Sequence, residues 1–401
     1  MNRRKFLVNT GLLTCGASIA TGDLFAREKP RTTQYAALKD HRIDKVEYLS
    51  AAYHYPRLVG RNARGGIHGQ HHKVSCVKLY TDQGAIGWSS VRMLPKDDEV
   101  QRTVIGKTVD ELINPDEGIS DDVSFTLDQV LHDLAGMILN KPVYEMLGAH
   151  GPKAAKVYSG MIYFDELDAD GKITSLDKVM NNCQWDYDHG YRQLKVKIGR
   201  GGKWYPHDEG LATDIKIVNM IHEEFGGKGV EILVDANDKY SLQDTIDFLK
   251  GVKGVPIYWV EEPFREELKK SRALKKWMMA NGREKTYYGD GENRPDYDLV
   301  KKMIVEDTLD MHLTDIVNYG FTKWRKLIPL LREHNAVASP HAWGYMLKTH
   351  YISHLSAGLG NVVTIEGVTC ISDDIDFGDY EIKDGKLHVS EKPGFGMKLL
   401  I

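Results

Sequence analysis

Residues 232–261, ILVDANDKYSLQDTIDFLKGVKGVPIYWVE, contain one complete unit of strand, helix and strand. The strand-like runs 232–235 and 258–261 each end in a carboxylate, and a helical pattern over 242–250 lies between them. Further runs of this kind end in an acid or a base about every 25–30 residues, which is the length of a strand, a turn and a helix. This spacing predicts a βα repeat.

A repeat of this kind gathers its strand ends in one place. In a (β/α)₈ barrel the carboxyl ends of the strands meet around one opening, and catalytic residues come from several of them. We therefore expect one pocket that contains all the strand-end acids and bases. In chain order these are Lys195 and Lys197, Asp235, Glu261, Glu292, Asp315, His341 and Glu366.

Three of these residues are carboxylates on consecutive strands. Asp235, Glu261 and Glu292 would repel one another in a pocket, and burying them without a cation is costly. Hard oxygen ligands suit Mg²⁺, and the absence of His or Cys from the trio disfavours zinc. We predict a Mg²⁺ site, with Asn237 and Asn293 placed to orient its ligands.

The remaining strand-end residues are candidate acids and bases. Lys195 and Lys197 are two residues apart on a strand, so they face the same side, and burial beside another cation lowers a lysine's pKa. We expect Lys197 to be a base and Lys195 to contact substrate oxygen. Asp315 is expected to fix the tautomer of His341, a second acid or base. Glu366 could hydrogen-bond the substrate if it is protonated.

The bulk properties are those of a globular protein. The chain has 401 residues with 42% hydrophobic and 27% charged content and a net charge of −4. That charge gives no support for a nucleic-acid partner. No run after the N-terminus is long enough for a stable membrane span, so we expect a soluble mature protein.

Residues 1–30 are predicted to be a twin-arginine signal. Asn2-Arg3-Arg4-Lys5-Phe6-Leu7 is a basic start, and an apolar stretch and small residues follow it. This pattern favours export to the periplasm. A lipid anchor is the alternative, although the segment before Cys15 is a poor match for one.

Residues 41–150 are predicted to be an α+β domain. Alternation over 74–80, a turn at 81–84 and a strand at 86–88 predict a hairpin, and apolar steps of three and four from Val130 onwards predict helices. A loop rich in His, Arg and Gly is expected over 54–72. The barrel is expected over 151–370, with helices at 213–225, 242–250, 267–279 and 324–333. Residues 371–401, with a hairpin around Asp384-Gly385, are expected to pack back on the first domain.

The motifs together resemble the mandelate racemase subgroup of the enolase superfamily. The resemblance covers about residues 43–401 and rests on Lys195-Val196-Lys197, Asp235-Ala236-Asn237, Trp259-Val260-Glu261-Glu262-Pro263, Gly291-Glu292-Asn293, Asp315 with Gly320 and Thr322, Ser339-Pro340-His341, Glu366 and Pro393-Gly394-Phe395-Gly396. Asp290 is an extra acid relative to that pattern. The resemblance implies a modified TIM barrel, (β/α)₇β, with an N-terminal α+β cap, and Mg²⁺ on Asp235, Glu261 and Glu292. It also implies Lys197 as the base on one face of the substrate, His341 with Asp315 on the other, and a homo-oligomer.

The expected reaction removes the proton alpha to a carboxylate. Arginines in the cap loop pair well with anions, so we predict a small anionic carbohydrate as substrate, contacted by Tyr53, Tyr55, Arg57, Arg61, Arg64, His68 and Asn237. The first interpretation is dehydration of a sugar acid to a 2-keto-3-deoxy acid. A racemase, epimerase or cycloisomerase of a carbohydrate acid is the alternative, and a non-catalytic exported sugar-acid binding protein is a hypothesis of another class.

Overall fold

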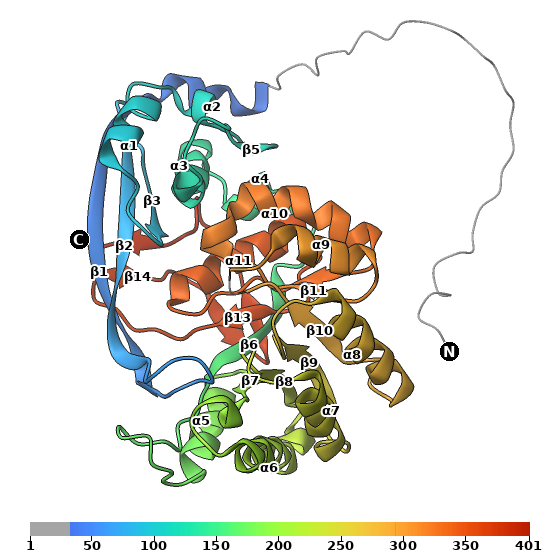
Figure 1. The fold of residues 1–401 in the computed structure, drawn as a ribbon. Coiled ribbons are helices and arrows are strands. Elements are labelled where there is room, and N and C mark those ends of the chain that lie inside the picture. Colours follow the sequence, from blue (N-terminus) through green and yellow to red (C-terminus); the bar gives the residue numbers. More distant parts are fainter. Residues whose placement is uncertain (1–32, 293) are drawn as a thin grey trace, which may run out of the picture. The chain divides into compact units, whose positions relative to one another are not determined.

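Eight parallel strands form a closed barrel in the computed structural model, which describes residues 33–292 and 294–401. From β6 to β12 each strand pairs with the next one along the chain, and β13 pairs with β6 (Figure 1). A bridge between Ala338 and Val362 connects β12 to the segment before β13. The strands are β6 (Ala154–Ile162), β7 (Gln193–Lys197), β8 (Glu231–Asp235), β9 (Ile257–Glu261), β10 (Tyr287–Asp290), β11 (Met311–His312), β12 (Val337–Ala338) and β13 (Ile365–Gly367).

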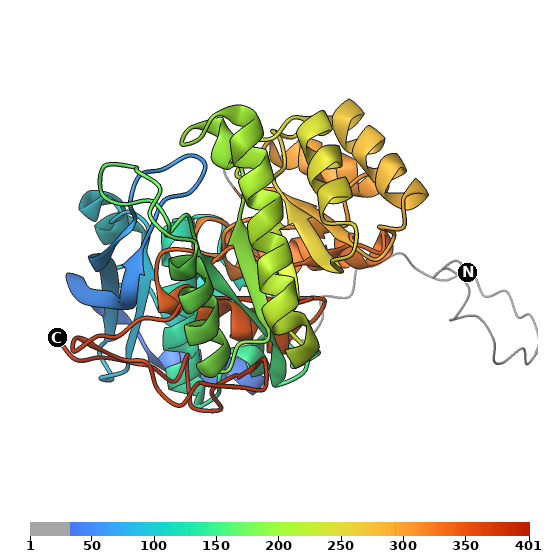
Figure 2. The same cartoon turned by 90° about the horizontal axis from the view of Figure 1, so that it is seen from below.

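One α-helix follows each of the first seven barrel strands. Figure 2 shows the helices around the outside of the strands. This arrangement confirms the βα repeat that the strand-end pattern predicts and the (β/α)₇β barrel that the resemblance implies. The helices are α5 (Asp177–Asp188), α6 (His207–Phe225), α7 (Leu242–Gly251), α8 (Leu268–Ala280), α9 (Tyr297–Val305), α10 (Ile316–Glu333) and α11 (Met346–Leu359), and the short 3₁₀ helices η4 (Arg200–Gly202) and η5 (Gly226–Lys228) flank α6.

Side-chain caps explain where two of these helices begin. Ser241 and Asp244 form a reciprocal capping box at the start of α7, which is a strong start signal. Asp315 caps α10 by accepting hydrogen bonds of 2.9 Å from the amides of Val317 and Asn318. α10 therefore begins eight residues before the expected 324, and Gly320, with a positive φ of 75°, interrupts it.

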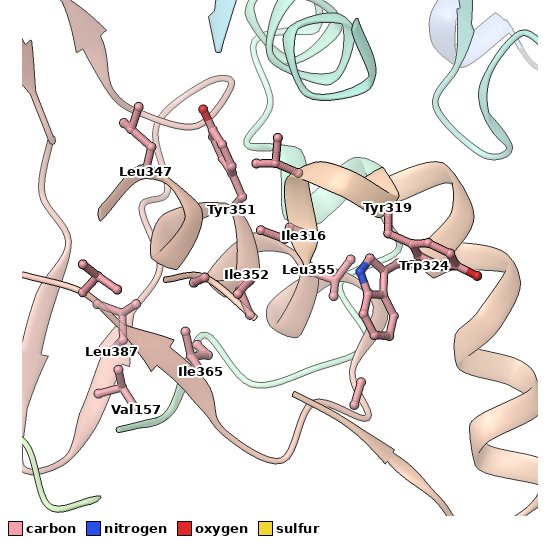
Figure 3. Packing of buried hydrophobic residues seen from close by; sticks show 14 of the residues in the cluster. Val157, Ile316, Tyr319, Trp324, Leu347, Tyr351, Ile352, Leu355, Ile365 and Leu387 are labelled. Atoms are coloured by element: carbon pink, nitrogen blue, oxygen red, sulfur yellow. The ribbon is translucent and has the colours of Figure 1, made fainter. Parts of the chain in front are cut away.

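The barrel helices pack around an apolar core. Every residue of α11 from Thr349 to Leu359 is buried. Figure 3 shows side chains of α11 grouped with those of α10 and with Val157 and Ile365 on adjacent barrel strands. Helix α11 is thus enclosed by the rest of the protein, and this fixes the rim that carries His341 and Lys348.

The cap contains a three-stranded antiparallel sheet (Figure 1). Its long hairpin joins β1 (Ile43–Val59) to β2 (Gly69–Thr81), and β3 (Ile86–Val91) follows. The expected loop over 54–72 is wrong in extent, because His54 pairs with His71 and the chain leaves the sheet only between Val59 and Gly69. Alternating burial from Ala51 to Tyr55 is the strand signal that the unusual composition obscured. The other cap elements are η2 (Thr33–Asp40), α1 (Asp97–Thr103), α2 (Val109–Leu112), β4 (Ile113–Asn114), β5 (Gly118–Ile119), η3 (Phe125–Leu127), α3 (Asp128–Leu139) and α4 (Val143–Met146).

The C-terminal segment contacts both the cap and the barrel. Its short strands are β14 (Ile375–Asp376), β15 (Glu381–Lys383), β16 (Lys386–His388) and β17 (Lys398–Leu399), and β15 and β16 form the expected hairpin around Asp384 and Gly385. β16 pairs with β6, while the amide of Phe395 donates to Asp133 of the cap at 2.8 Å. Residues Tyr35–Ile401 form one compact unit. Among the described helices, none combines the length and apolar character needed to cross a membrane.

Candidate active site

Three carboxylates from neighbouring strands converge at one end of the barrel. Asp235 ends β8, Glu261 ends β9, and Glu292 lies two residues beyond the end of β10. One oxygen from each lies within 4.8 Å of the others. Asp235 and Glu261 are buried, with 0% and 1% of their surface exposed. The structure therefore brings together the three residues that the sequence predicts as metal ligands.

The trio has the features of a cation site. Glu261 Oε2 and Glu292 Oε2 are buried without a hydrogen-bond partner among the described residues, and such oxygens are ligands for a hard divalent cation. Asn237 orients Asp235 through its amide at 2.8 Å and its side chain at 3.2 Å. Asn237 and Glu262 have positive φ (46° and 37°), a strained conformation that is concentrated at functional sites. Asn293 lies outside the described residues.

The two lysines of β7 are buried beside the trio. Lys195 lies 3.1 Å from Glu261 and 2.9 Å from Glu366, and Lys197 forms an ion pair with Asp235. Burial lowers the pKa of Lys197, but the charges of Asp235, Glu292 and Glu261 together outweigh it and raise that pKa. The expected lowering is therefore wrong for this state. A base role requires Asp235 to be withdrawn from Lys197.

The surroundings of Glu366 favour its ionised form. Burial would raise its pKa, but Lys195, His341 and the amide of Ala342 lower it to about 2. Its Oε2 also accepts the amide of Trp343 at 3.0 Å. Glu366 is thus an anchor for Lys195 and for the chain after His341, and the expectation of a protonated donor is wrong for this state.

His341 lies between two carboxylates. Its Nδ1 is 3.1 Å from Asp315 and its Nε2 is 3.1 Å from Glu292. Lys348 of α11, which the sequence analysis missed, donates to Asp315 at 2.7 Å. Burial would raise the pKa of Asp315, but Lys348 and His341 hold it well below its usual range. The expected His–Asp pair is present, and the lowered pKa favours the ionised form of Asp315.

Asp290, the extra acid at the end of β10, does not join the trio. It is buried, and burial together with Glu266 and Asp238 raises its pKa well above the usual range. The raised pKa favours the neutral form of Asp290, which adds no negative charge beside Glu292.

A cavity of about 460 Å³ opens onto His341, Glu292 and Asp315. Tyr53 from the cap lines it, and its hydroxyl donates to the carbonyl of Gly344 at 2.7 Å. Three cationic residues that the sequence analysis missed also line it: Lys73, Arg92 and Arg294. The sequence argument from residues at strand ends does not identify them, because two lie in the cap and one in a barrel loop.

The three arginines among the predicted substrate contacts divide into two groups. Arg57 makes two 2.8 Å hydrogen bonds with buried Asp186, and Arg61 donates to the carbonyls of residues 168 and 169, so neither supports substrate binding here. Arg64 instead pairs with Asp238 and with Glu262, the residue after Glu261.

The remaining aromatic contacts enclose the site. His68 packs edge-on against Tyr163 and Trp343, with ring centroids 4.8 and 5.4 Å apart. Burial, and then the nearby charge of Lys197, lowers the pKa of His68 to about 4, so it is neutral. Tyr55 stacks on Trp343 and donates to Gly344 at 2.7 Å. These residues can exclude water from the side of the site near Lys197.

Comparisons with known proteins agree with this geometry. Residues 178–400 match the family model described as enolase C-terminal domain-like. A galacturonate dehydratase from Geobacillus sp., solved with D-galacturonate and 5-keto-4-deoxy-D-galacturonate, is 29% identical with a TM-score of 0.82, over 90% of this chain and 95% of that chain. A mandelate racemase/muconate lactonizing protein from Geobacillus sp. Y412MC10, solved with magnesium and tartrate, is also 29% identical with a TM-score of 0.83, over 90% and 93%. Arabinonate dehydratase of Saccharolobus solfataricus is 24% identical over 284 residues, which is 67% of this chain and 68% of the relative.

Proposed function

The chain belongs to the enolase C-terminal domain-like family, within the enolase superfamily, and from this premise we propose that it is a Mg²⁺-dependent sugar-acid dehydratase. The reaction removes the proton alpha to the substrate carboxylate and expels the beta hydroxyl. The product is an acid with a keto group beside the carboxylate and a deoxy carbon beyond it. Atoms balance because one water leaves and the enol rearranges to the ketone.

One observation carries the proposal: the carboxylate trio lies between two sources of a base. Two of the trio end β8 and β9, the third lies two residues beyond β10, the lysines lie on β7, and His341 follows β12. Two bases on different sides of one cation site can act on the alpha carbon and on the beta oxygen of the same substrate.

The residues of the trio fit Mg²⁺, because all three are carboxylates and two of them, Glu261 and Glu292, have a buried oxygen without a hydrogen-bond partner among the described residues. When bound, Mg²⁺ would supply Lewis-acid stabilisation of the charge that develops on the substrate carboxylate as the proton leaves. Lys195 is held by Glu261 and Glu366, where it can donate to a carboxylate oxygen of the substrate.

Proton transfer is assigned to two residues. Lys197 removes the alpha proton once Asp235 no longer pairs with it. His341, held by Asp315 at Nδ1, uses Nε2 to protonate the leaving hydroxyl, since this nitrogen faces Glu292 at the cavity. The aromatic group of His68, Tyr163 and Trp343 keeps water away from the lysine side.

A racemase or epimerase is the second candidate, favoured by the same two-base arrangement. A screen of sugar acids with Mg²⁺-loaded protein in heavy water separates the two. A dehydratase forms a keto acid and loses one water, whereas a racemase or epimerase exchanges the alpha hydrogen for deuterium without that loss. Lys197→Ala and His341→Ala should each lower keto-acid formation by at least about 100-fold. Full activity of both variants would refute the assignment, and binding without turnover would favour the non-catalytic alternative.

We further propose export through the twin-arginine route and assembly as a homo-oligomer. The signal at residues 1–30 lies outside the described residues. A variant with Arg3→Lys and Arg4→Lys should stay in the cytoplasm, and periplasmic recovery of that variant would contradict the route. Sedimentation of the mature protein tests assembly, and a monomer at all concentrations would contradict it.

A further inference from the structure

The cavity beside His341 has an excess of positive charge at its rim. Lys73 lies on β2, Arg92 directly after β3 and Arg294 beyond the end of β10, so three separate segments supply the cations. All three side chains are exposed, yet they line the same cavity as Glu292 and His341. A chance placement of surface charges would not explain why cations from three separate segments line one opening.

These cations make no ion pair with any described residue, as judged from the contacts of 33–292 and 294–401. The carboxylates deeper in the site do not require them. Asp235, Glu261, Glu292 and Glu366 are balanced by the two buried lysines together with one divalent cation. Asp315 is already balanced by Lys348 at 2.7 Å. The rim charges therefore remain available to a ligand.

We propose that the substrate carries a second anionic group, at the end opposite to the carboxylate that reacts, and that Lys73, Arg92 and Arg294 bind it. This inference rests on the proposed function, because it names the substrate class of the same site. Arginine binds carboxylate and phosphate oxygens through paired N–H groups, and lysine adds a compact charge. The substrate class is thus a sugar diacid or a sugar acid phosphorylated at its far end.

The cavity suits the rest of such a molecule. Its volume of about 460 Å³ lies in the range of small-molecule sites. Ser75 and Asn318 line it as well and offer neutral hydrogen-bonding groups for the hydroxyls between the two ends. Binding at both ends would fix the register of the chain, so that the alpha carbon stays beside the bases.

Matched ligands test the proposal without requiring turnover. Calorimetry with Mg²⁺-loaded protein compares each hexaric acid, including galactarate, with the hexonic acid of the same configuration and with its 6-phosphate. We expect wild-type protein to bind at least one dianion about 10–100-fold more tightly than its monoanionic partner, since a hydrogen bond to a charged group has about that effect. The comparison of hexaric acids with the 6-phosphates shows whether the second anionic group is a carboxylate or a phosphate.

Charge-removing variants show whether the rim causes the preference. Arg92→Gln, Arg294→Gln and Lys73→Gln should each reduce the ratio of dianion to monoanion affinity by several-fold, and the triple variant should abolish the preference. Arg102→Gln is the matched control, because Arg102 is an exposed cap arginine that pairs with Asp98 and does not line the cavity. It should leave the ratio unchanged.

Two results would overturn the inference: equal affinities for dianion and monoanion throughout the panel, or a preference that survives in the triple variant. Failure of the proposed function looks different. If the preference and its loss are observed but no ligand yields a keto acid, the second-anion site holds and the dehydration proposal fails. If a monoanionic acid is dehydrated with no dianion preference, the dehydration proposal holds and this inference fails.

Discussion

Replacing Lys195 with methionine should destabilise the metal-free protein far more than a surface lysine change does. Lys195 is 1% exposed and lies within 3.1 Å of both Glu261 and Glu366 and 3.8 Å from Asp235. Methionine keeps most of the aliphatic volume and removes the charge. Removing one partner of a buried ion pair costs about 3–5 kcal/mol, because the remaining charge stays buried and unbalanced.

Mg²⁺ should restore much of this loss. A divalent cation on the carboxylates replaces the missing positive charge, so ligand binding stabilises the folded state, by about 2.7 kcal/mol at 100 times the dissociation constant. Unfolding is followed by circular dichroism in chelator and in excess Mg²⁺. We expect Mg²⁺ to raise the unfolding midpoint of Lys195→Met more than that of wild-type protein.

The control is Lys156→Met. Lys156 pairs with Glu231 at 2.8 Å, but both side chains are roughly half exposed, so its loss should cost at most about 1 kcal/mol and show no extra response to Mg²⁺. The reasoning is refuted if Lys195→Met is as stable as wild-type protein in chelator, or if Mg²⁺ stabilises both proteins equally.

Three further predictions concern packing, pH and a corrected residue. Gly87→Ala should cost about 2–3 kcal/mol, because its Cβ would lie 2.5–2.6 Å from atoms of Leu134, whereas Gly254→Ala meets no such clash; denaturant unfolding compares them. Burial lowers the pKa of His350 from 6.5 to about 3, so only the unfolded state takes up this proton as pH falls below 6.5, and the free energy of unfolding declines. Between pH 7.5 and pH 5, His350→Phe should lose about 2 kcal/mol less of this free energy than wild-type protein does. Equal losses in the two proteins would contradict this. Arg57→Met should lower the free energy of unfolding by about 3–5 kcal/mol, because it leaves the buried carboxylate of Asp186 unpaired. KM for a substrate should stay within a few-fold of the wild-type value. A rise in KM without a loss of stability would instead support a role of Arg57 in substrate binding.

The part of the site that the sequence predicts consists of residues at the ends of barrel strands. Residues at the ends of parallel strands meet by topology alone, so the sequence is enough to predict that Asp235, Glu261, Glu292 and His341 lie together. The hairpin at Asp384-Gly385 was equally readable, because its turn requires two residues with positive φ.

Contacts that depend on three-dimensional packing were not readable. Lys348 reaches Asp315 from the helix after His341, and Arg92 and Arg294 reach the cavity from loops, so spacing along the chain does not indicate them. The ion pair of Arg57 could not be predicted either, because composition alone does not reveal a buried partner such as Asp186. The direction of the pKa shift of Lys197 cannot be predicted from spacing for the same reason, since it depends on the distance from Asp235.

Anomalous scattering from crystals grown with Mn²⁺, a hard cation that takes the same oxygen ligands as Mg²⁺, gives the most direct test of the account. We predict one peak about 2.0–2.3 Å from an oxygen of each of Asp235, Glu261 and Glu292, with the ammonium of Lys197 displaced from Asp235. A structure in which the trio holds no peak, while Asp235 stays paired with Lys197, would contradict the account.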